Sequence, residues 1–118
     1  MRQAFYEWRA PSAPVQAAQA YAAAHYGRRL TLCEVASAVH LSKNYFSSLF
    51  RAQTGMTFTQ YVNLLRVEKS KEYLRGTGLP IVEVMTRVGF EDQSYFSKVF
   101  KQATQLSPGQ YRSRRNAS

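Results

Sequence analysis

One sequence pattern occurs twice in this chain, and this repetition constrains the fold more than any other feature. The first copy lies within residues 32–61 and the second within residues 81–111. The copies are offset by 49 residues in their first halves and by 50 residues in their second halves, so they differ by one inserted residue. Surface turns tolerate insertions better than regular elements do. Each copy is therefore predicted to be two elements joined by a turn.

The matched positions run through the whole of each copy. In the first half, the pairs are Leu32 and Ile81, Glu34 and Glu83, Val35 and Val84, Val39 and Val88, and Leu41 and Phe90. In the second half, they are Tyr45-Phe46-Ser47 and Tyr95-Phe96-Ser97, Phe50 and Phe100, Arg51 and Lys101, Thr54 and Thr104, Thr57 and Ser107, and Tyr61 and Tyr111. Two copies are too few for a solenoid.

The second copy has the outline of a helix-turn-helix. Val84 and Val88 are spaced as on one face of a short helix, and Gly89 follows where a tight turn needs a residue that tolerates a positive φ. The next apolar stripe has the helical spacing i, i+3, i+4 and consists of Phe96, Val99 and Phe100. We expect the Asp92 side chain to accept hydrogen bonds from the free N–H groups that begin this second helix. Two short helices joined by a glycine turn are typical of this motif.

The whole chain is predicted to be an all-α domain of about seven helices, with two helix-turn-helix subdomains joined by a long linker helix. In the first copy, Thr31 and Ser42 are the expected N-caps. The expected segments are an N-terminal segment or upstream linker at 1–12, the folded domain at 13–113 and a basic tail at 114–118. Within the domain, we expect the first motif at 31–53, the linker helix at 58–75 and the second motif at 80–104.

The chain is strongly basic, with sixteen Lys and Arg against seven Asp and Glu and a formal net charge of +9. Such a charge favours a polyanionic partner, although charge alone also fits an anionic membrane or a merely soluble domain. No run approaches the roughly 18 apolar residues of a membrane span, and no signal-peptide core is present. We therefore expect a cytoplasmic protein with no membrane partner.

The residues that carry catalysis or bind metals are sparse. Cys33 is the only cysteine, which excludes an internal disulfide and a zinc site made of several cysteines. Its place between Leu32 and Val35 predicts a reduced and partly buried thiol. His25 and His40 are isolated, and neither a nucleophile–base arrangement nor a glycine-rich phosphate loop can be found. We therefore expect no enzymatic activity, no cofactor and no metal site.

The predicted second helix of each motif has a polar face beside its apolar stripe. Short polar side chains let a helix approach the floor of the DNA major groove, where Asn and Gln can bind adenine and Lys can bind guanine. The expected base-reading residues are Asn44, Ser47, Ser48, Gln93, Ser94, Ser97 and Lys98. The residues expected to contact phosphates, which position a protein without reading sequence, are Lys43, Arg51, Lys101 and Arg112.

A solvated helix face is the alternative interpretation for each of these residues taken alone. The recurrence of the same exposed positions in both copies favours DNA contact for the set. Tyr45 and Tyr95 border both faces of their helices. We expect them to pack on the core with their hydroxyl groups toward backbone phosphates.

The second copy, written VxxxVGFxDQSYFSKVFKxxxxxSPxxYR, resembles the signature of the AraC/XylS transcription regulators. The resemblance extends over residues 15–112. It implies two helix-turn-helix subdomains that read successive major-groove segments on one side of bent DNA, one helical turn (~34 Å) apart. It also implies sequence-specific binding of double-stranded DNA and regulation of transcription, with activation as the expected direction and RNA polymerase as a further partner.

Three positions depart from the family pattern, which usually has Gly at Gln105 and Ala at Met85 and Ser70. Gln105 predicts a changed local turn, and Met85 predicts altered packing inside the second motif. The segment LSKNYFSSLFRAQTGMTFTQYV is most similar to members that follow a phosphorylated receiver domain. This similarity indicates a response-regulator fragment with an upstream regulatory domain, whereas other members carry a sugar-binding domain or stand alone.

Two other classes of function fit the sequence less well. A nonspecific architectural protein or an RNA-binding protein needs minor-groove wedges or stacking aromatic residues, whereas the aromatic residues here fall mostly on apolar stripes. Alkyl-DNA repair enzymes with a related helical domain need cysteine clusters that this chain lacks. The sequence therefore favours a DNA-binding regulator associated with the nucleoid.

Overall fold

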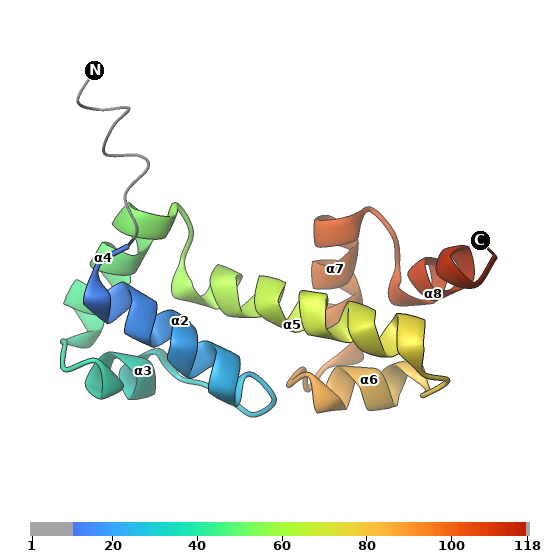
Figure 1. Cartoon of the computed structure of the whole chain (residues 1–118), viewed down its shortest axis with the longest axis horizontal. Coiled ribbons are helices and arrows are strands. Elements are labelled where there is room, and N and C mark those ends of the chain that lie inside the picture. The colour runs from blue at the N-terminus through green and yellow to red at the C-terminus, as the bar shows by residue number, and fades with distance from the viewer. Residues whose placement is uncertain (1–10, 118) are drawn as a thin grey trace, which may run out of the picture.

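The computed structural model describes residues 11–117, and every regular element in this range is a helix. The helices are α2 (Ala13–His25), α3 (Leu32–Ala38), α4 (Lys43–Thr54), α5 (Phe58–Gly76), α6 (Ile81–Arg87), α7 (Gln93–Thr104) and α8 (Pro108–Ala117). Two lobes are joined by α5, which confirms the predicted all-α fold with two helix-turn-helix motifs (Figure 1). The expected N-terminal segment, residues 1–12, lies almost wholly outside the described residues. Within the described part, no helix combines the length and apolar character needed to cross a membrane.

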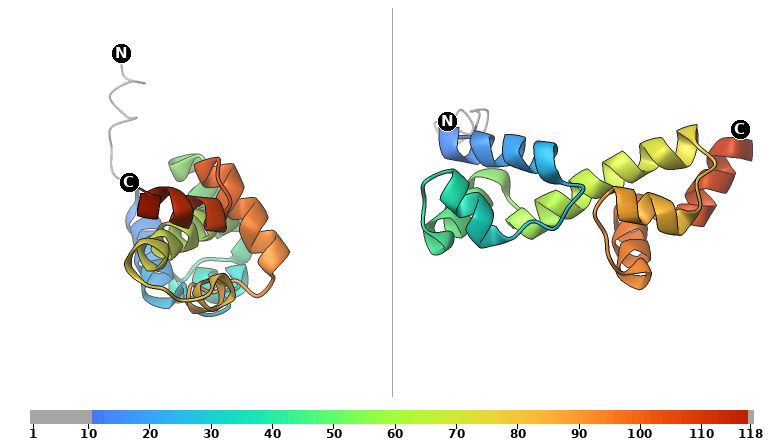
Figure 2. Two further views of the ribbon diagram at one scale, coloured as in Figure 1. Left: turned by 90° about the vertical axis from the view of Figure 1, so that its right-hand side faces the viewer. Right: turned by 90° about the horizontal axis from the view of Figure 1, so that it is seen from below.

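Each lobe has its own hydrophobic core, and α5 contributes to both. The right-hand view of Figure 2 shows α5 running from one lobe into the other. The first lobe consists of α2, α3, α4 and the N-terminal half of α5, and its buried residues are Val15, Ala18, Ala22, Val35, Ala36, Phe46, Phe50, Phe58 and Val62. The second lobe consists of the C-terminal half of α5 with α6, α7 and α8, and its buried residues are Val67, Leu74, Val84, Met85, Val88, Phe90, Phe96, Val99 and Phe100. The molecule is accordingly elongated, with extents of 47 × 35 × 21 Å.

The two lobes repeat each other down to the geometry of their aromatic rings. The ring centroids of Phe50 and Tyr61 lie 5.5 Å apart at an interplanar angle of 70°. Those of Phe100 and Tyr111 lie 5.5 Å apart at 74°. Edge-on ring pairs of this kind have a preferred geometry that adds to simple burial. The sequence repeat is therefore a structural repeat as well.

The two predicted serine and threonine caps are present, but the predicted aspartate cap is not. The Thr31 hydroxyl accepts a bond from the Glu34 N–H at 3.1 Å, and the Ser42 hydroxyl accepts one from the Tyr45 N–H at 3.2 Å. Asp92 occupies the N-cap position of α7, but its carboxylate accepts no bond from that helix. Its backbone, with φ −125° and ψ 120°, differs from that of Ser42, with φ −68° and ψ 156°. The prediction of an Asp92 cap was therefore wrong.

Four residues with positive φ mark the turns of the two motifs. Between the paired helices, His40 (φ 64°) occupies in the first lobe the place that Gly89 (φ 100°) occupies in the second. After the second helix of each motif, Gly55 (φ 80°) and Gln105 (φ 71°) correspond in the same way. The turn expected to change at Gln105 keeps its geometry, because the Gln105 N–H still donates to the Lys101 carbonyl at 2.8 Å.

Three further positions singled out in the sequence are resolved by the structure. Cys33 is exposed, because the buried face of the short helix α3 is formed by Val35 and Ala36, so the prediction of a partly buried thiol was wrong. The backbone of the expected tail is helical as far as Ala117. Ser70, which stands where the family usually has Ala, is fully buried, and its hydroxyl donates to the Val67 carbonyl at 2.7 Å.

Candidate nucleic-acid interface

The second helices of the two motifs, α4 and α7, are the elements that present the polar side chains singled out in the sequence. In Figure 1, α3 and α6 form the lower edge of the two lobes, and α4 and α7 each rise from there toward the upper edge. The turns held by His40 and Gly89 join the paired helices in each lobe. The molecule therefore presents two similar helices in the same orientation, fixed to one continuous helix.

The predicted base-reading residues lie on the accessible faces of α4 and α7. The exposed ones are Asn44, Ser48, Gln93, Ser94 and Lys98. Ser47 and Ser97, which occupy the same position in the two repeats, are half-buried beside the apolar stripes. Among the described residues, none of these seven side chains is committed to a hydrogen bond. Each is therefore available to a partner.

The four predicted phosphate-contacting residues separate into two groups. Lys43, Arg51 and Lys101 are exposed, and none of them forms an ion pair within the described part of the chain. Arg112 lies elsewhere, on α8, and its guanidinium donates to the carbonyl oxygens of Leu74 and Thr77 at 3.3 Å each. Arg112 therefore caps the C-terminal end of α5.

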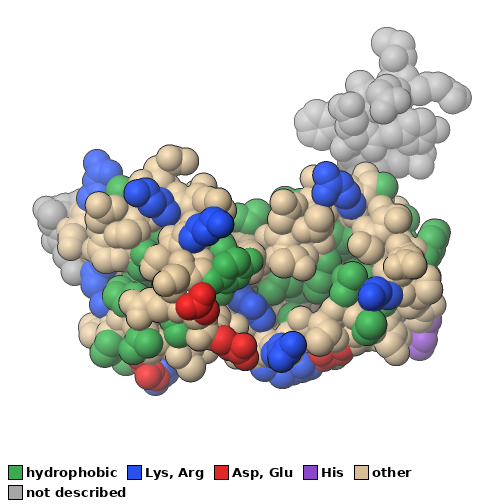
Figure 3. Space-filling model, turned by 180° about the vertical axis from the view of Figure 1, so that it is seen from behind, with side chains coloured by type: hydrophobic (Ala, Val, Ile, Leu, Met, Phe, Trp, Pro, Cys, Tyr) green, Lys and Arg blue, Asp and Glu red, His purple; other side chains and the backbone are tan. Residues whose placement is uncertain are grey.

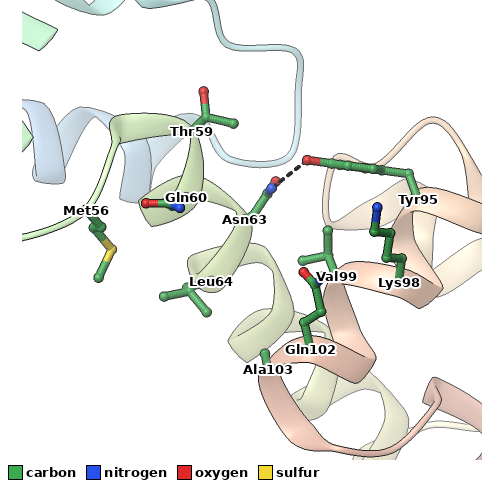
Figure 4. A pocket seen from close by; sticks show the side chains of 10 residues that line it. All are labelled: Met56, Thr59, Gln60, Asn63, Leu64, Tyr95, Lys98, Val99, Gln102 and Ala103. Carbon is green, nitrogen blue, oxygen red and sulfur yellow. Dashed lines mark hydrogen bonds between the residues drawn. The ribbon is translucent and has the colours of Figure 1, made fainter.

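A groove of about 490 Å³ separates the N-terminal half of α5 from α7 (Figure 4). Its lining residues are Met56, Thr59, Gln60, Asn63, Leu64, Tyr95, Lys98, Val99, Gln102 and Ala103. Across its end, the Asn63 amide donates to the Tyr95 hydroxyl at 2.8 Å. Tyr95 is thereby tied to α5, whereas no such bond holds its counterpart Tyr45 among the described residues. Tyr95 is 44% exposed and Tyr45 is 58% exposed, so the prediction that both pack on the core was wrong. The two tyrosines thus differ in their surroundings despite their matched positions.

The charges of the surface are distributed unevenly. Among the described residues, the ion pairs are Arg28 with Glu34, Lys69 with Glu72, Lys71 with Glu68 and Arg87 with Glu83. All four lie outside α4 and α7, so no carboxylate of these pairs offsets the positive charge of the cations on α4 and α7. Seen from behind, the molecule carries Lys and Arg across both lobes and acidic side chains only in the lower part (Figure 3). The upper part is therefore the more suitable one for a polyanion.

The segment after α2 is held to α3 by a polar cluster. The Glu34 carboxylate accepts hydrogen bonds from the Arg28 guanidinium and from the Tyr21 hydroxyl, the latter at 2.7 Å. The bond from Arg28, followed by that from Tyr21, lowers the pKa of Glu34 to about 2. Glu34 is therefore ionised at neutral pH and fixes the path of the chain between the first two helices.

Sequence reasoning missed Arg66, which is a half-buried cation on α5. Its Nε donates to the Tyr26 carbonyl and its guanidinium also donates to the Arg28 carbonyl, at 2.9 Å in both cases. Burial lowers the pKa of Arg66, and the nearby Glu91 and Tyr95 partly offset this effect. A charged residue between Leu65 and Val67, on a helix that touches two cores, was the available signal. Among the described residues, no cluster of His, Cys, Asp and Glu is arranged to hold a metal ion.

Comparison with known proteins shows many relatives of this architecture. Residues 35–114 match the family model described as a helix-turn-helix domain. The Uncharacterized HTH-type transcriptional regulator YijO from Escherichia coli K12 is 37% identical over 97 residues, which make up 82% of this chain and 34% of that protein. This chain spans about a third of the length of several curated relatives that it matches.

Solved structures match over almost the whole described range. The C-terminal domain of AraT, a response regulator from Geobacillus stearothermophilus, has a TM-score of 0.85 and 38% identity, with 91% of this chain and 89% of that chain covered. The DNA-binding domain of AdpA, a global transcriptional factor seen in complex with a target DNA, has a TM-score of 0.83 and 25% identity. That match covers 90% of this chain and 96% of that one.

Proposed function

Since the chain belongs to the AraC-type helix-turn-helix family of transcription regulators, we propose that it binds double-stranded DNA sequence-specifically through α4 and α7. Each helix lies in one of two successive major-groove segments on the same side of the duplex. Such segments recur about every 34 Å along B-DNA. The relative seen in complex with a target DNA, AdpA, supports DNA as the partner.

One observation carries this proposal. The structure holds two repeat-related helices in the same orientation on one continuous helix (Figure 1). Both helices expose the same uncommitted polar positions. A single polar helix face is common in proteins and is explained by solvation alone. A second copy in the same orientation is not required for solvation, but it is what two successive grooves of one duplex require.

We assign base contacts to Asn44, Ser47 and Ser48 on α4, and to Gln93, Ser94, Ser97 and Lys98 on α7. Lys43, Arg51 and Lys101 are assigned to phosphates, which position the domain without specifying sequence. Arg112 is left out of this assignment, because its guanidinium is already bound to two carbonyl groups at the end of α5.

We further propose that the domain regulates transcription, as an activator that contacts RNA polymerase on the nucleoid. Its similarity to a response regulator's C-terminal domain supports control by a regulatory domain in the same polypeptide. The greater length of the curated relatives agrees with this arrangement, since the chain matches only 34% of YijO.

Selection from a random duplex library, followed by footprinting at near-physiological salt, tests the proposal. We expect two enriched sequence blocks about one helical turn apart, with a footprint on one side of the duplex. If no sequence is enriched and the affinity falls steeply as the salt concentration rises, specific binding is contradicted and only electrostatic attraction to DNA is left.

Single substitutions then assign each block to its helix. Lys98→Ala should relax base preference in one block by about 1–3 kcal/mol, and Ser47→Ala should alter preference only in the other block. Lys71→Ala is the matched control, because Lys71 lies on α5 and pairs with Glu68. It should leave both blocks unchanged. If Lys98→Ala instead weakens binding to all sequences by the same factor, Lys98 contacts a phosphate and not a base.

A further inference from the structure

The two lobes meet at a second place besides α5, where the segment after α2 touches the turn between α6 and α7. Tyr26 ends α2 in the first lobe, yet its ring packs against the core of the second lobe and lies 5.7 Å from the Lys69 ammonium. In Figure 1 this segment reaches the turn between α6 and α7 beneath the middle of α5. The first lobe thus inserts one residue into the second.

Two glycines allow the backbones to approach closely at this junction. A Cβ built on Gly89 would lie 2.2 Å from the Tyr26 carbonyl oxygen and 2.8 Å from Arg66 Nε. A Cβ built on Gly27 would lie 3.3 Å from the Arg87 carbonyl oxygen. The first distance is far below any tolerated contact, so only glycine fits at Gly89. Its counterpart His40 has the same left-handed backbone but an exposed side chain, because no lobe packs on that turn.

Arg66 closes the junction. It projects from the middle of α5 and donates to the carbonyls of Tyr26 and Arg28, both at 2.9 Å, so it binds the chain on both sides of Gly27. Its guanidinium carbon lies 5.7 Å from the centre of the Phe90 ring, which follows Gly89 in the second motif. A guanidinium holds its donors in a rigid planar fork and has a flat face that lies over a ring, whereas an ammonium is a compact point charge without a fixed fork.

We propose that Arg66 is the positioning residue that fixes the distance and angle between α4 and α7, so that the domain accepts only one spacing between its two blocks of DNA sequence. The consequence for DNA rests on the proposed function, whereas the mechanical part does not. With the Arg66 contacts intact, the lobes are joined by α5 and by the junction at Tyr26 and Gly89. Without them, α5, the packing of the Tyr26 ring and the Asn63–Tyr95 bond remain, and we expect bending of α5 to change the separation of the two helices.

The geometry of DNA makes this restriction measurable. Adding one base pair between two blocks rotates one block by about 34° and moves it by about 3.4 Å relative to the other. A rigid pair of helices cannot follow both changes, whereas a hinged pair can. We therefore expect the wild-type domain to prefer its selected spacing over spacings longer or shorter by one base pair by about tenfold or more.

The test compares Arg66→Met with Arg75→Met. Arg75 also lies on α5, but its guanidinium donates to the Tyr111 hydroxyl within the second lobe, at 2.8 Å. Spin labels on Ala52 and Gln102, two exposed and repeat-related positions on α4 and α7, report the distance between the helices without DNA. Cys33→Ser is included in every variant because Cys33 is exposed and would also be labelled.

We expect Arg66→Met to broaden the distance distribution and to reduce the spacing preference to about threefold or less, while Arg75→Met changes neither. Affinity for each block alone should stay within about twofold of wild type, since the contacts of α4 and α7 with bases are untouched. If Arg66→Met does not fold, Arg66→Lys decides, because it keeps the charge and loses the forked pair of bonds. It should show the same changes to a smaller degree.

An unchanged distance distribution in a folded Arg66 variant overturns the proposal, whatever the DNA measurements show. A broadened distribution with an unchanged spacing preference also overturns it, because the junction would then not set the spacing. A wild-type domain that selects no two-block site shows instead that the proposed function has failed, and this result is visible before any Arg66 variant is made.

Discussion

Gln105 ends α7 with the same left-handed backbone with which Gly55 ends α4, at φ values of 71° and 80°. An L residue in this conformation costs roughly 1 kcal/mol more than glycine, because its Cβ crowds a neighbouring carbonyl. Gln105→Gly should therefore raise the free energy of unfolding by about 1 kcal/mol in urea denaturation.

The reciprocal variant provides the control for this prediction. Nothing lies within 4 Å of a Cβ added to Gly55, so Gly55→Gln meets no steric obstacle and should lower the free energy of unfolding by about the same amount. Opposite signs for the two variants identify the backbone as the cause. Equal signs would show that the glutamine side chain, rather than its φ, determines stability at these turns.

Gly89 and His40 hold matched turns, but we expect them to respond very differently to alanine. Gly89→Ala places a methyl group 2.2 Å from the Tyr26 carbonyl, so the two lobes must separate or the turn must deform. We expect a loss of more than about 2 kcal/mol in the free energy of unfolding. His40→Ala keeps a non-glycine residue at a positive φ on an exposed turn and should change stability by less than about 0.5 kcal/mol. A loss of only about 1 kcal/mol for Gly89→Ala, which is the cost of a positive φ by itself, would mean that the contact between the lobes does not make glycine necessary at Gly89.

Glu34 gives the domain a defined dependence on acid. Its pKa falls from an ordinary value of 4.5 to about 2 in the folded protein, so its interactions stabilise the fold fully above about pH 4.5. This contribution is lost as the pH falls from 4.5 toward 2, because the carboxylate becomes protonated. We expect Glu34→Gln to flatten the fall in stability across this range, as measured by urea denaturation at a series of pH values.

Two further variants test which partner lowers the pKa of Glu34. Arg28→Met should raise it more than Tyr21→Phe, since the Arg28 hydrogen bond is the larger cause. Carbon-detected NMR titration of the Glu34 carboxyl group measures both shifts. The reverse order would show that the tyrosine hydroxyl is the main partner in solution.

Salt dependence separates the cations that contact phosphate from the one that caps a helix. Arg51→Ala and Lys101→Ala should each reduce, by about 1, the magnitude of the slope of the logarithm of the DNA association constant against the logarithm of the salt concentration. The loss of affinity should be similar for all sequences. Arg112→Ala should leave this slope unchanged and lower thermal stability, because it removes the bonds to Leu74 and Thr77. A reduced slope for Arg112→Ala would return this residue to the DNA interface.

The sequence alone predicted the all-α fold and the repeat, because both depend on the spacing of apolar residues such as Phe46 and Phe96. It also predicted the caps at Thr31 and Ser42, which depend on atoms only three residues apart. The prediction of the Asp92 cap was wrong, because a suitable side chain at the N-cap position is not enough: the backbone there differs from that of Ser42 in both φ and ψ.

The junction between the lobes was beyond prediction for a different reason. Arg66 lies 40 residues from Tyr26 in sequence, and nothing local to either residue indicates their hydrogen bond. Gly89 was noticed for its φ, but its contact with the first lobe depends on how two separately predicted motifs pack. The assigned DNA contacts remain predictions, since exposure on α4 and α7 establishes access and not binding.

The sharing of α5 between two cores also determines how the molecule unfolds. Phe58 and Val62 belong to the first core, and Val67 and Leu74 belong to the second. Helix α5 has 19 residues, so each half is shorter than the roughly 12–15 residues below which an isolated helix is marginally stable in water, and each half therefore depends on the core that it enters. If one half of α5 unfolds, the other half loses its helical neighbour, and the core into which that other half packs is destabilised as well. The two motifs, although copies of one pattern, should therefore denature as a single cooperative unit with one transition.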